Sequence, residues 1–228
     1  MTRTNEWGQP IGDDLAGWEA PPKPPHADLV GGAATLRPID VDAHAVELFP
    51  AYADAADSLF TYLPWGPFVD AGDLAATLRR LDELPDWQVY AIDAGDRLLG
   101  FICYLRIQPS HGSIEIGGIT FSPALQRTRA ATESMYLLIR HAFDVGYRRV
   151  EWKCDALNAP SVAAAERLGF TYEGTFRQAT HYRGRNRDTA WFSILDHEWP
   201  SLDAGFQHWF EPSNFDSNGQ QRAPLRVR

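Results

Sequence analysis

The chain has 228 residues, and its 44% hydrophobic and 12% aromatic residues can fill a core, which excludes wholesale disorder. Its formal net charge of −9 argues against a broad nucleic-acid or acidic-membrane surface, because such surfaces depend on clustered positive charge. No apolar run approaches the roughly 18 residues of a membrane span, and the polar N-terminus lacks the apolar core of a signal peptide.

We interpret the N-terminal residues as a proline-rich arm. Four prolines surround Lys23, and proline this dense cannot join a helix or a central strand. Trp7 and Trp18 indicate that parts of the arm pack on the domain, although a partly ordered tail fits the sequence equally well. We therefore predict an arm over residues 1–34, one domain over 35–200, and a polar tail with scattered aromatic residues over 201–228.

The first half of the domain predicts strands and helices in an antiparallel arrangement. The expected elements are a strand over 34–39, a helix capped by Asp40 or Asp42 and ending near Tyr52, a helix over 70–84, and two strands over 87–92 and 98–107 joined by a turn at 94–96. Between the helices, residues 58–68 are aromatic and carry Pro64, Gly66 and Pro67, which exclude a regular helix. This aromatic segment either lines a substrate pocket or plugs the edge of the core.

The second half of the domain centres on a strand–helix–strand–helix unit over residues 113–170. Its strands are expected over 113–121 and 150–154, and its helices open near Gln126 and at Asn158. Two further strands, over 171–182 and 189–196, are joined by a polar turn at 183–186. The fold class is therefore α+β, with one crossover unit between antiparallel parts.

The cysteines predict a reducing compartment. Cys103 and Cys154 both lie in strand-like apolar runs, where buried free thiols are the default and a disulfide is the alternative. We therefore expect a cytoplasmic protein.

Several common nucleotide-binding, nucleophilic-serine and zinc-binding motifs are absent from the sequence. It holds no P-loop, no G-x-G-x-x-G, no G-x-S-x-G and no cysteine–histidine cluster at zinc spacing, so we expect no metal. The turn at Gln126 opens a helix, whose free amides and dipole suit a pyrophosphate, and Arg127 and Arg129 add charge. Asn158 is a good N-cap with Ser161 in the first turn, which on physical grounds alone is a plain capping element.

Several short motifs lie in and around the helix that opens at Asn158, and their order is informative. The helix carries Asn-x-x-Ser at 158–161, ends in Glu-Arg-Leu-Gly-Phe at 166–170, and leads to Glu173-Gly174. In this order the motifs resemble the GNAT superfamily of acyl-CoA-dependent N-acyltransferases, and most of all its RimJ/RimL type. Further matches are Gln126, Ala131, Thr132 and Glu133 in the family's Gln-Gly-x-Gly-x-Ala-Thr-Glu turn, Ile116-Gly117 in its splayed strand, and Asp188 and Glu198-Trp199 in its closing hairpin.

The resemblance covers about residues 35–200. It implies a mixed, mostly antiparallel GNAT-like sheet with a splayed strand pair and flanking helices. Backbone groups of Ile119 and Phe121, around Thr120, would pair with the pantetheine arm of acetyl-CoA or another acyl-CoA, as an added strand does. The pyrophosphate would lie on the turn and the first helical turn, which comprise Gln126, Arg127, Thr128, Arg129, Ala130, Ala131 and Thr132.

The resemblance also implies the catalytic roles. Asn158 would orient the thioester or pantetheine, and Ser161 would sit near the sulfur and protonate the departing thiolate through a positioned hydrogen bond. Glu115 would deprotonate the acceptor amine through water, or else form a surface salt bridge. His111 and His181 are less specific alternatives for the base.

The sequence departs from the family pattern at three positions. Arg127 and Arg129 replace both glycines of the turn, where glycine lets amides approach the phosphates closely. Either the turn keeps a conformation that arginine tolerates, or the phosphates shift toward the guanidinium groups. Ala165 stands where many members have a tyrosine acid, which leaves Ser161 as the acid.

The expected function is transfer of an acetyl or related acyl group from acyl-CoA to a primary amine by direct attack, without a covalent enzyme intermediate. RimJ/RimL relatives act on protein N-termini or on small amines, and the resemblance makes a homodimer plausible. Three alternatives stay open: a succinyl-CoA-type acyltransferase, a non-catalytic GNAT-fold binding module, and a transferase using aminoacyl-tRNA, against which the acidic charge speaks.

Overall fold

The structure, a computed structural model, describes residues 3–227 and contains one large mixed sheet. In spatial order its strands are β3 (Leu29–Val30), β4 (Thr35–Pro38), β5 (Gln88–Asp93), β6 (Leu98–Gln108), β7 (Ser113–Phe121), β8 (Arg149–Asp155), β10 (Arg185–Leu195) and β9 (Thr171–Tyr182). Only β7 and β8 are parallel, and all other neighbours are antiparallel. This confirms the predicted α+β class with one crossover unit.

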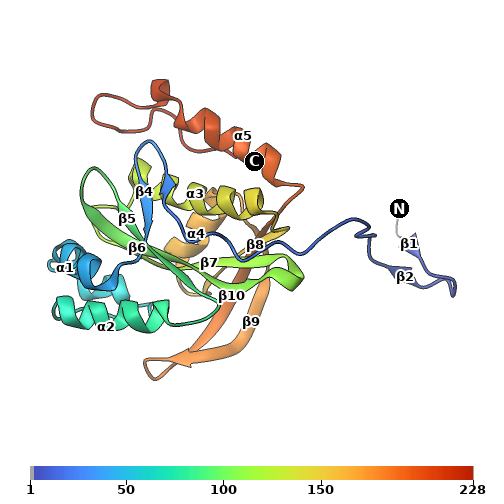
Figure 1. Ribbon diagram of the computed structural model, residues 1–228, viewed down its shortest axis with the longest axis horizontal. Helices are drawn as coiled ribbons and strands as arrows, with labels where there is room; N and C mark the ends of the chain where they lie inside the picture. The colour runs from blue at the N-terminus through green and yellow to red at the C-terminus, as the bar shows by residue number, and fades with distance from the viewer. Residues whose placement is uncertain (1–2, 228) are drawn as a thin grey trace.

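Helices cover both faces of the sheet (Figure 1). They are α1 (Val41–Tyr52), α2 (Ala71–Asp82), α3 (Arg129–Val145), α4 (Ala159–Arg167) and α5 (Trp199–Phe210). One apolar cluster lies between α1, α2 and strands β5 and β6, and a larger one joins α3, α4 and α5 to the opposite face. The two clusters follow from strand alternation, because neighbouring residues of β5 and β6 point to opposite faces.

Two helices begin at predicted caps, Asp40 and Asn158, and a third has an aspartate cap of the same kind. Asp40, Asp70 and Asn158 each accept a hydrogen bond from an amide in the first turn of α1, α2 and α4. The helix expected near Gln126 begins later, because Thr128 is its N-cap and accepts from the amide of Ala131 at 3.1 Å.

Strand boundaries in the large sheet match the sequence analysis to within one residue, apart from β10 and from β3, which lies inside the predicted arm over residues 1–34. β7 and β9 have the predicted bounds. β10 begins at Arg185 rather than Thr189, because Arg185 pairs with Tyr182 and the hairpin continues to its tip. The predicted four-residue turn is therefore reduced to Arg183 and Gly184.

The aromatic segment, residues 58–68, is largely part of the core. It contains the end of a short 3-10 helix, Asp57–Phe60, and no α-helix. Phe60 and Phe68 are buried beside Tyr52 of α1, and Trp65 is buried beside Phe101 of β6. The core-plug interpretation therefore holds for these rings, while the backbone between them reaches the surface.

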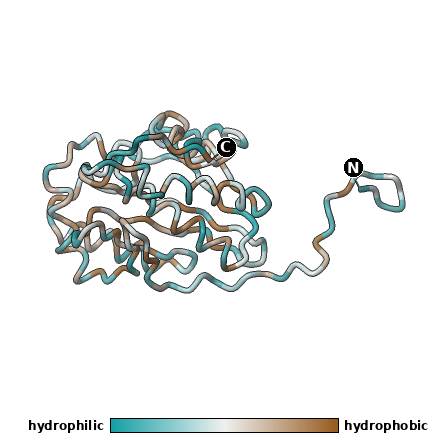
Figure 2. Tube along the Cα trace, turned by 90° about the horizontal axis from the view of Figure 1, so that it is seen from above, coloured by the Kyte–Doolittle hydropathy of each residue, from teal (hydrophilic) through white to brown (hydrophobic). Residues whose placement is uncertain are grey.

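The N-terminal arm has two parts. Residues near Lys23 lie along the domain, where Lys23 Nζ donates to the Pro85 carbonyl and Gln88 Nε2 donates to that of Pro24. The hairpin of β1 (Arg3–Thr4) and β2 (Pro10–Ile11) extends away from the body, as Figures 1 and 2 show. Trp7, which the sequence suggested would pack, is 75% exposed.

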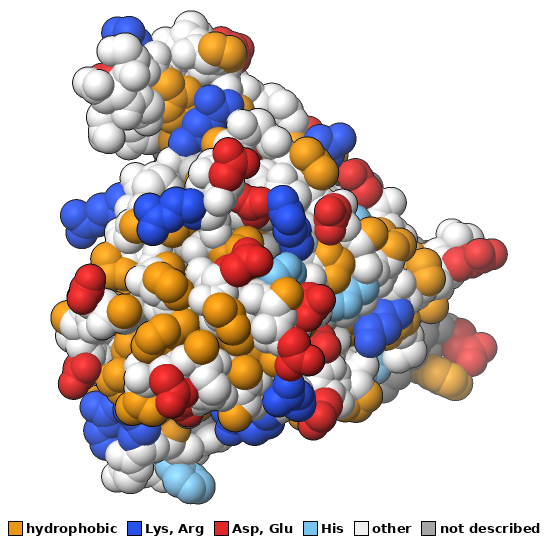
Figure 3. All heavy atoms as spheres, turned by 60° about the vertical axis from the view of Figure 1, so that its left-hand side comes forward, with side chains coloured by type: hydrophobic (Ala, Val, Ile, Leu, Met, Phe, Trp, Pro, Cys, Tyr) orange, Lys and Arg blue, Asp and Glu red, His pale blue; other side chains and the backbone are white. Residues whose placement is uncertain are grey.

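The C-terminal residues pack on the domain. The expected boundary between residues 200 and 201 falls inside α5, whose Leu202, Phe206 and Trp209 are buried. Leu225 and Val227 are buried as well. Within residues 3–227, no helix combines the length and apolar character that a membrane crossing requires. Acidic and basic side chains are interspersed on the face that Figure 3 shows.

Glu133 ties the start of the sheet to α3. Its buried carboxylate accepts hydrogen bonds from the amides of Gly32, Ala33 and Ala34, just before β4. A Cβ on Gly31 would lie 2.5 Å from the Glu133 side chain, so the chain passes very close to it. One side chain thus satisfies three amides that no strand pairs at this point.

Replacement of Glu133 by alanine should destabilise the fold. It leaves the three loop amides without their acceptor, so we expect the free energy of unfolding to fall by about 3 kcal/mol. Urea unfolding followed by circular dichroism measures the change. Glu47→Ala, at an exposed position of α1, is the matched control and should stay within about 0.5 kcal/mol of the wild type. Equal losses in both variants would contradict the role given to Glu133.

Candidate active site

The site begins where two parallel strands part. β7 and β8 pair only through Ser113–Glu115 and Arg149–Glu151, and beyond these residues β7 continues beside β6 while β8 continues beside β10. A bulge assists the separation, because the partners of Phe101 and Cys103 on β7 are three residues apart, Thr120 and Gly117. α3 and α4 follow the diverging ends. The parting leaves the inner edges of β7 and β8 unpaired between them.

Gly118 allows the backbone of β7 to bend at the bulge. Its φ of +60° lies in the left-handed region, which favours glycine. A Cβ there would also lie 2.9 Å from Cys103 Sγ on β6.

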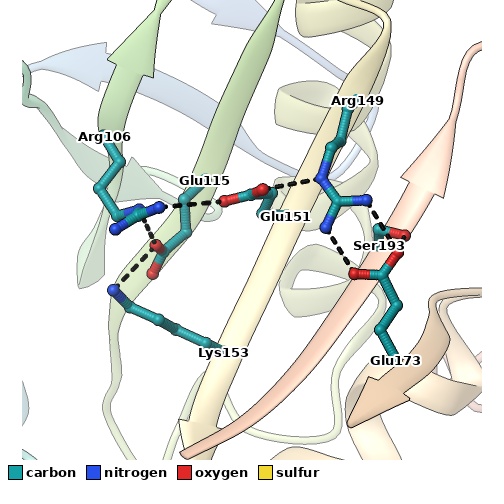
Figure 4. Close-up of polar contacts among 7 residues, drawn as sticks. All are labelled: Arg106, Glu115, Arg149, Glu151, Lys153, Glu173 and Ser193. Carbon is teal, nitrogen blue, oxygen red and sulfur yellow. Dashed lines mark hydrogen bonds and ion pairs between the residues drawn. The ribbon is translucent and has the colours of Figure 1, made fainter. Parts of the chain in front are cut away.

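Glu115 is the last residue of β7 that pairs with β8, and it is buried. Its side chain is 2% exposed, with Oε2 3.2 Å from Lys153 Nζ and 3.3 Å from Arg106 Nε (Figure 4). Burial raises its pKa to about 7, against the opposing effects of Lys153 and Arg106. Glu115 does form ion pairs, but its carboxylate is buried, so the interpretation as a surface salt bridge is wrong as to the place of this side chain.

Arg106 reaches Glu115 from an irregular position of β6. It has a φ of +49° at a register shift between Leu105 and Gln108. A non-glycine residue in this conformation costs about 1 kcal/mol or more. The bulge brings its guanidinium to Glu115 and over the Trp191 ring, 5.1 Å from the centroid.

The ion pairs continue across the sheet from Glu115 (Figure 4). Arg106 Nη2 lies 3.8 Å from Glu151, Arg149 Nε donates to Glu151 at 2.7 Å, and Arg149 Nη1 donates to Glu173 at 2.8 Å. With Lys153 and Glu115, three cations alternate with three carboxylates. The alternation fixes the orientation of each group and limits the freedom of the Glu115 carboxylate.

Ser161 lies on the other face of β8. Its Oγ accepts a hydrogen bond from Trp152 Nε1 at 3.1 Å. Trp152 belongs to the cluster beneath α4, whereas the next residue, Lys153, faces Glu115. Because Trp152 donates, the hydroxyl proton of Ser161 is directed to another partner, and the neighbouring Cys154 sulfur is one such acceptor. Ser161 and Glu115 thus approach the parted strands from opposite faces of the sheet.

Asn158 caps α4, and Cys154 lies beside Ser161. Asn158 Oδ1 accepts from the Ser161 amide at 3.2 Å, as the capping interpretation expects. Burial raises the pKa of the Cys154 thiol, while a hydrogen bond with Ser161 lowers it. Cys103 is also a buried free thiol whose pKa burial raises. Both cysteines are therefore poor nucleophiles, because the thiolate is the reactive form.

The turn before α3 accommodates both arginines. Arg127 adopts a φ of +60°, the left-handed conformation that glycine would supply at little cost. Thr128 accepts from the amides of Ala131 and Thr132. Those of Arg129 and Ala130 have no partner in the part of the chain that the structure describes. Arg127 thus adopts a conformation that arginine tolerates at some cost, and the position of the phosphates on this turn stays a prediction.

The other residues predicted for the cofactor lie along β7 and its exit. Gln126 Nε2 donates to the Phe121 carbonyl at 3.1 Å. Thr120 is buried, and its Oγ1 accepts from Trp65 Nε1 at 3.1 Å. Ile119 and Phe121 are half-buried at the unpaired edge of β7. The side chain of Thr120 is thus committed to the core.

Within residues 3–227, neither of the two histidines proposed as alternatives is paired with Glu115. His111 precedes β7 and lines a hollow with Trp18 and Arg148, and His181 is exposed on β9. Within residues 3–227, no three His, Cys, Asp or Glu side chains are grouped as a metal would require. Sequence reasoning missed Lys153 and Trp191. Their positions facing one another on neighbouring strands were the available signal, because directly paired residues share a face.

The aromatic segment borders the opening. Arg185 Nη2 donates to the Thr61 carbonyl at 2.9 Å, and Arg183 Nη2 donates to that of Trp65 at 2.7 Å. On the other side Tyr62 Oη donates to the carbonyl of Leu157, just before α4, at 3.0 Å. The segment therefore links the tip of the β9–β10 hairpin to the start of α4.

Comparison with known proteins identifies this arrangement. A family model described as an acetyltransferase (GNAT) domain matches residues 34–171. A GCN5-related N-acetyltransferase from Brucella melitensis is 41% identical, with a TM-score of 0.89 over 92% of this chain and 97% of that one. Mycothiol acetyltransferase of Pseudarthrobacter chlorophenolicus is 31% identical over 151 residues, which are 64% of this chain and 45% of that protein, so the match spans under half of that relative.

The fold is also that of RimL, a ribosomal L7/L12 α-N-protein acetyltransferase solved with coenzyme A. RimL has a TM-score of 0.64 and 23% identity over 74% of this chain and 98% of its own. The splayed sheet and the motifs at 126–133 and 158–170 agree with these matches, and the chain belongs to the GNAT acetyltransferase family.

Proposed function

We propose that the chain is an acyl-CoA-dependent N-acetyltransferase, which moves an acetyl group from acetyl-CoA to a primary amine by direct attack. The observation that carries the proposal is Glu115, a buried carboxylate with a pKa of about 7 beside the parted strands. A base with a pKa near the working pH is both ionised and strong enough to take a proton from an ammonium group through water. The family match and the CoA complex of RimL support acyl-CoA as the cosubstrate.

The proposed reaction uses the two faces of the sheet. The ammonium group of the acceptor loses one proton to Glu115 through water, and its neutral nitrogen forms a bond to the thioester carbon. The carbon–sulfur bond then breaks as the nitrogen gives up its second proton, which reaches the departing thiolate by way of the Ser161 hydroxyl, so that Ser161 ends as it began. The amides near Arg129 hold the pyrophosphate, and the edge of β7 near Ile119 pairs with pantetheine. Asn158 positions Ser161 through the cap of α4.

The acceptor in this proposal is a protein N-terminus or a small amine. The RimL and mycothiol acetyltransferase matches represent these two classes, respectively. The aromatic segment, held by Arg183 and Arg185, forms the acceptor side. A cytoplasmic location and a homodimer belong to the same proposal. For the dimer, the exposed edge strand β9 with Tyr172 and Phe176 offers a surface, and light scattering of the purified chain measures it.

Binding and turnover test the function together. Isothermal titration should show acetyl-CoA binding with a Kd below a millimolar. Release of free CoA thiol should depend on an added amine, tested with a panel of peptides and small amines. No binding at millimolar acetyl-CoA would overturn the proposal, and binding without turnover across the panel would favour a non-catalytic binding module. Faster turnover with succinyl-CoA than with acetyl-CoA would identify the alternative acyl group.

Replacement of Ser161 by alanine should lower kcat more than cofactor affinity. Loss of a hydrogen bond to the developing thiolate lowers kcat by roughly ten- to a thousandfold. Steady-state kinetics with acetyl-CoA, together with titration of CoA binding, separates the two effects. Ser201→Ala, on the exposed side of α5, is the control and should behave as the wild type. An unchanged kcat in Ser161→Ala would remove Ser161 from the mechanism.

Replacement of Glu115 by glutamine should change the pH profile. In the wild type, kcat/KM should rise as pH increases through about 7, because the ionised carboxylate is the base. The variant loses this limb, and its rate instead follows the free fraction of unprotonated amine. Rates between pH 5.5 and 9 measure the difference, with Glu47→Gln as the control for charge. A uniform small loss that keeps the limb at pH 7 would make Glu115 structural.

A further inference from the structure

The C-terminal segment places three aromatic rings beside the proposed phosphate turn. Trp209 and Phe210 end α5, which lies alongside α3 (Figure 1), and Phe215 follows on the chain. The Trp209 ring lies 5.1 Å from that of Phe210 and 5.0 Å from that of Phe215, measured between centroids. We call these three rings the tail cluster.

Two arginines from different helices stack on the tail cluster. The guanidinium carbon of Arg129, the first residue of α3, lies 4.6 Å from the Phe215 centroid and 5.8 Å from that of Phe210. The guanidinium carbon of Arg167, the last residue of α4, lies 5.5 Å from the Trp209 centroid. The rings order both side chains, because cation–π contacts favour one orientation.

Neither guanidinium is neutralised. Within residues 3–227, no carboxylate lies within 4.0 Å of Arg129 or Arg167. Glu133, one turn after Arg129, has its carboxylate committed to three amides of the arm. Burial lowers the pKa of Arg167, as expected for a cation that loses water without gaining an acid.

The hydrogen bonds of the two side chains converge on one place. Arg167 Nη1 donates to Thr132 Oγ1 at 3.2 Å, in the first turn of α3. Arg129, three residues earlier, donates from Nη2 to the Phe210 carbonyl at 3.2 Å. A guanidinium has five N–H donors, so each retains unused donors beside the turn. Aromatic stacking with free forked donors is an arrangement suited to phosphate recognition.

We propose that Arg129 and Arg167, ordered by the tail cluster, bind the 3′-phosphate of CoA and thereby select CoA over dephospho-CoA. The inference rests on the proposed function, since it needs CoA to bind at the turn. The amides of Arg129 and Ala130 suit the pyrophosphate. The ribose phosphate lies beyond the pyrophosphate on the same molecule and is a monoester with up to two negative charges. Two uncompensated arginines beside the turn match this charge.

The competing explanation is that both arginines only attach the C-terminal segment to α3 and α4. It predicts the same affinity for CoA and for dephospho-CoA, which differ only in the 3′-phosphate. The ratio of the two affinities in one protein sample is therefore the decisive quantity. Global unfolding of part of the sample lowers the binding-competent fraction for both ligands equally and leaves the ratio of their affinities unchanged.

Isothermal titration of the full chain with CoA and with dephospho-CoA measures this ratio. We expect the wild type to bind CoA at least about tenfold more tightly. In Arg129→Gln and in Arg167→Gln the ratio should fall, and in the double variant it should approach one. Arg80→Gln, at an exposed position of α2 on the other face of the sheet, removes the same charge and should keep the wild-type ratio.

The outcomes separate this inference from the proposed function. Equal binding of the two ligands by the wild type overturns the inference and leaves the acetyltransferase proposal standing. A preserved ratio in the double variant overturns it as well, because the preference then comes from other residues. No binding of either ligand by the wild type overturns the proposed function itself.

Discussion

The short contact between β7 and β8 is the constraint on which the rest of the site depends. The two strands are parallel, and they pair through three residues each before they diverge. Strands that part inside a sheet leave unpaired amides and carbonyls, which are costly when they find no partner. In this protein the unpaired backbone groups lie between the diverging ends of β7 and β8. The bulge at Gly118, helices α3 and α4, and the aromatic segment surround them. A ligand that adds a strand would complete the pairing, which explains why an extended pantetheine suits this gap.

The charges around the gap follow from the same separation. Glu115 is the last residue to pair with β8, so its side chain meets Lys153 from the diverging strand and Arg106 from the neighbouring bulge. Two cations would hold an exposed carboxylate fully ionised, yet burial is the larger effect on this one. The balance gives an acid whose protonation changes near neutrality, as proton transfer at neutral pH requires. The ion pairs form a series in which cations and carboxylates alternate: Lys153, Glu115, Arg106, Glu151, Arg149 and Glu173. Each cation of the series therefore has a counter-ion.

Much of the fold follows from local sequence patterns. Strand alternation, the caps at Asp40 and Asn158, and the turn residues predicted nearly every element, because these signals act over a few residues. The family motifs at 158–170 located Ser161 correctly at the start of α4. The surroundings of Glu115 could not be predicted in this way. They depend on Arg106 at an irregular position of β6 and on Lys153, 38 positions along the chain from Glu115. Sequence periodicity does not show where a bulge occurs or which strands become neighbours.

Arg127 and Arg129 are tolerated in the turn for different physical reasons. Arg127 takes the left-handed conformation itself, at a cost of about 1 kcal/mol, directly before Thr128, the N-cap of α3. Arg129 is in ordinary helical conformation, so the absence of glycine there costs no strain. Its side chain would extend into solvent if the chain ended at residue 200. Instead α5 and the residues after it return to α3 and supply the rings on which Arg129 and Arg167 lie. Arg129 and the C-terminal segment are therefore connected, because the rings of Phe210 and Phe215 hold the Arg129 side chain in its ordered position.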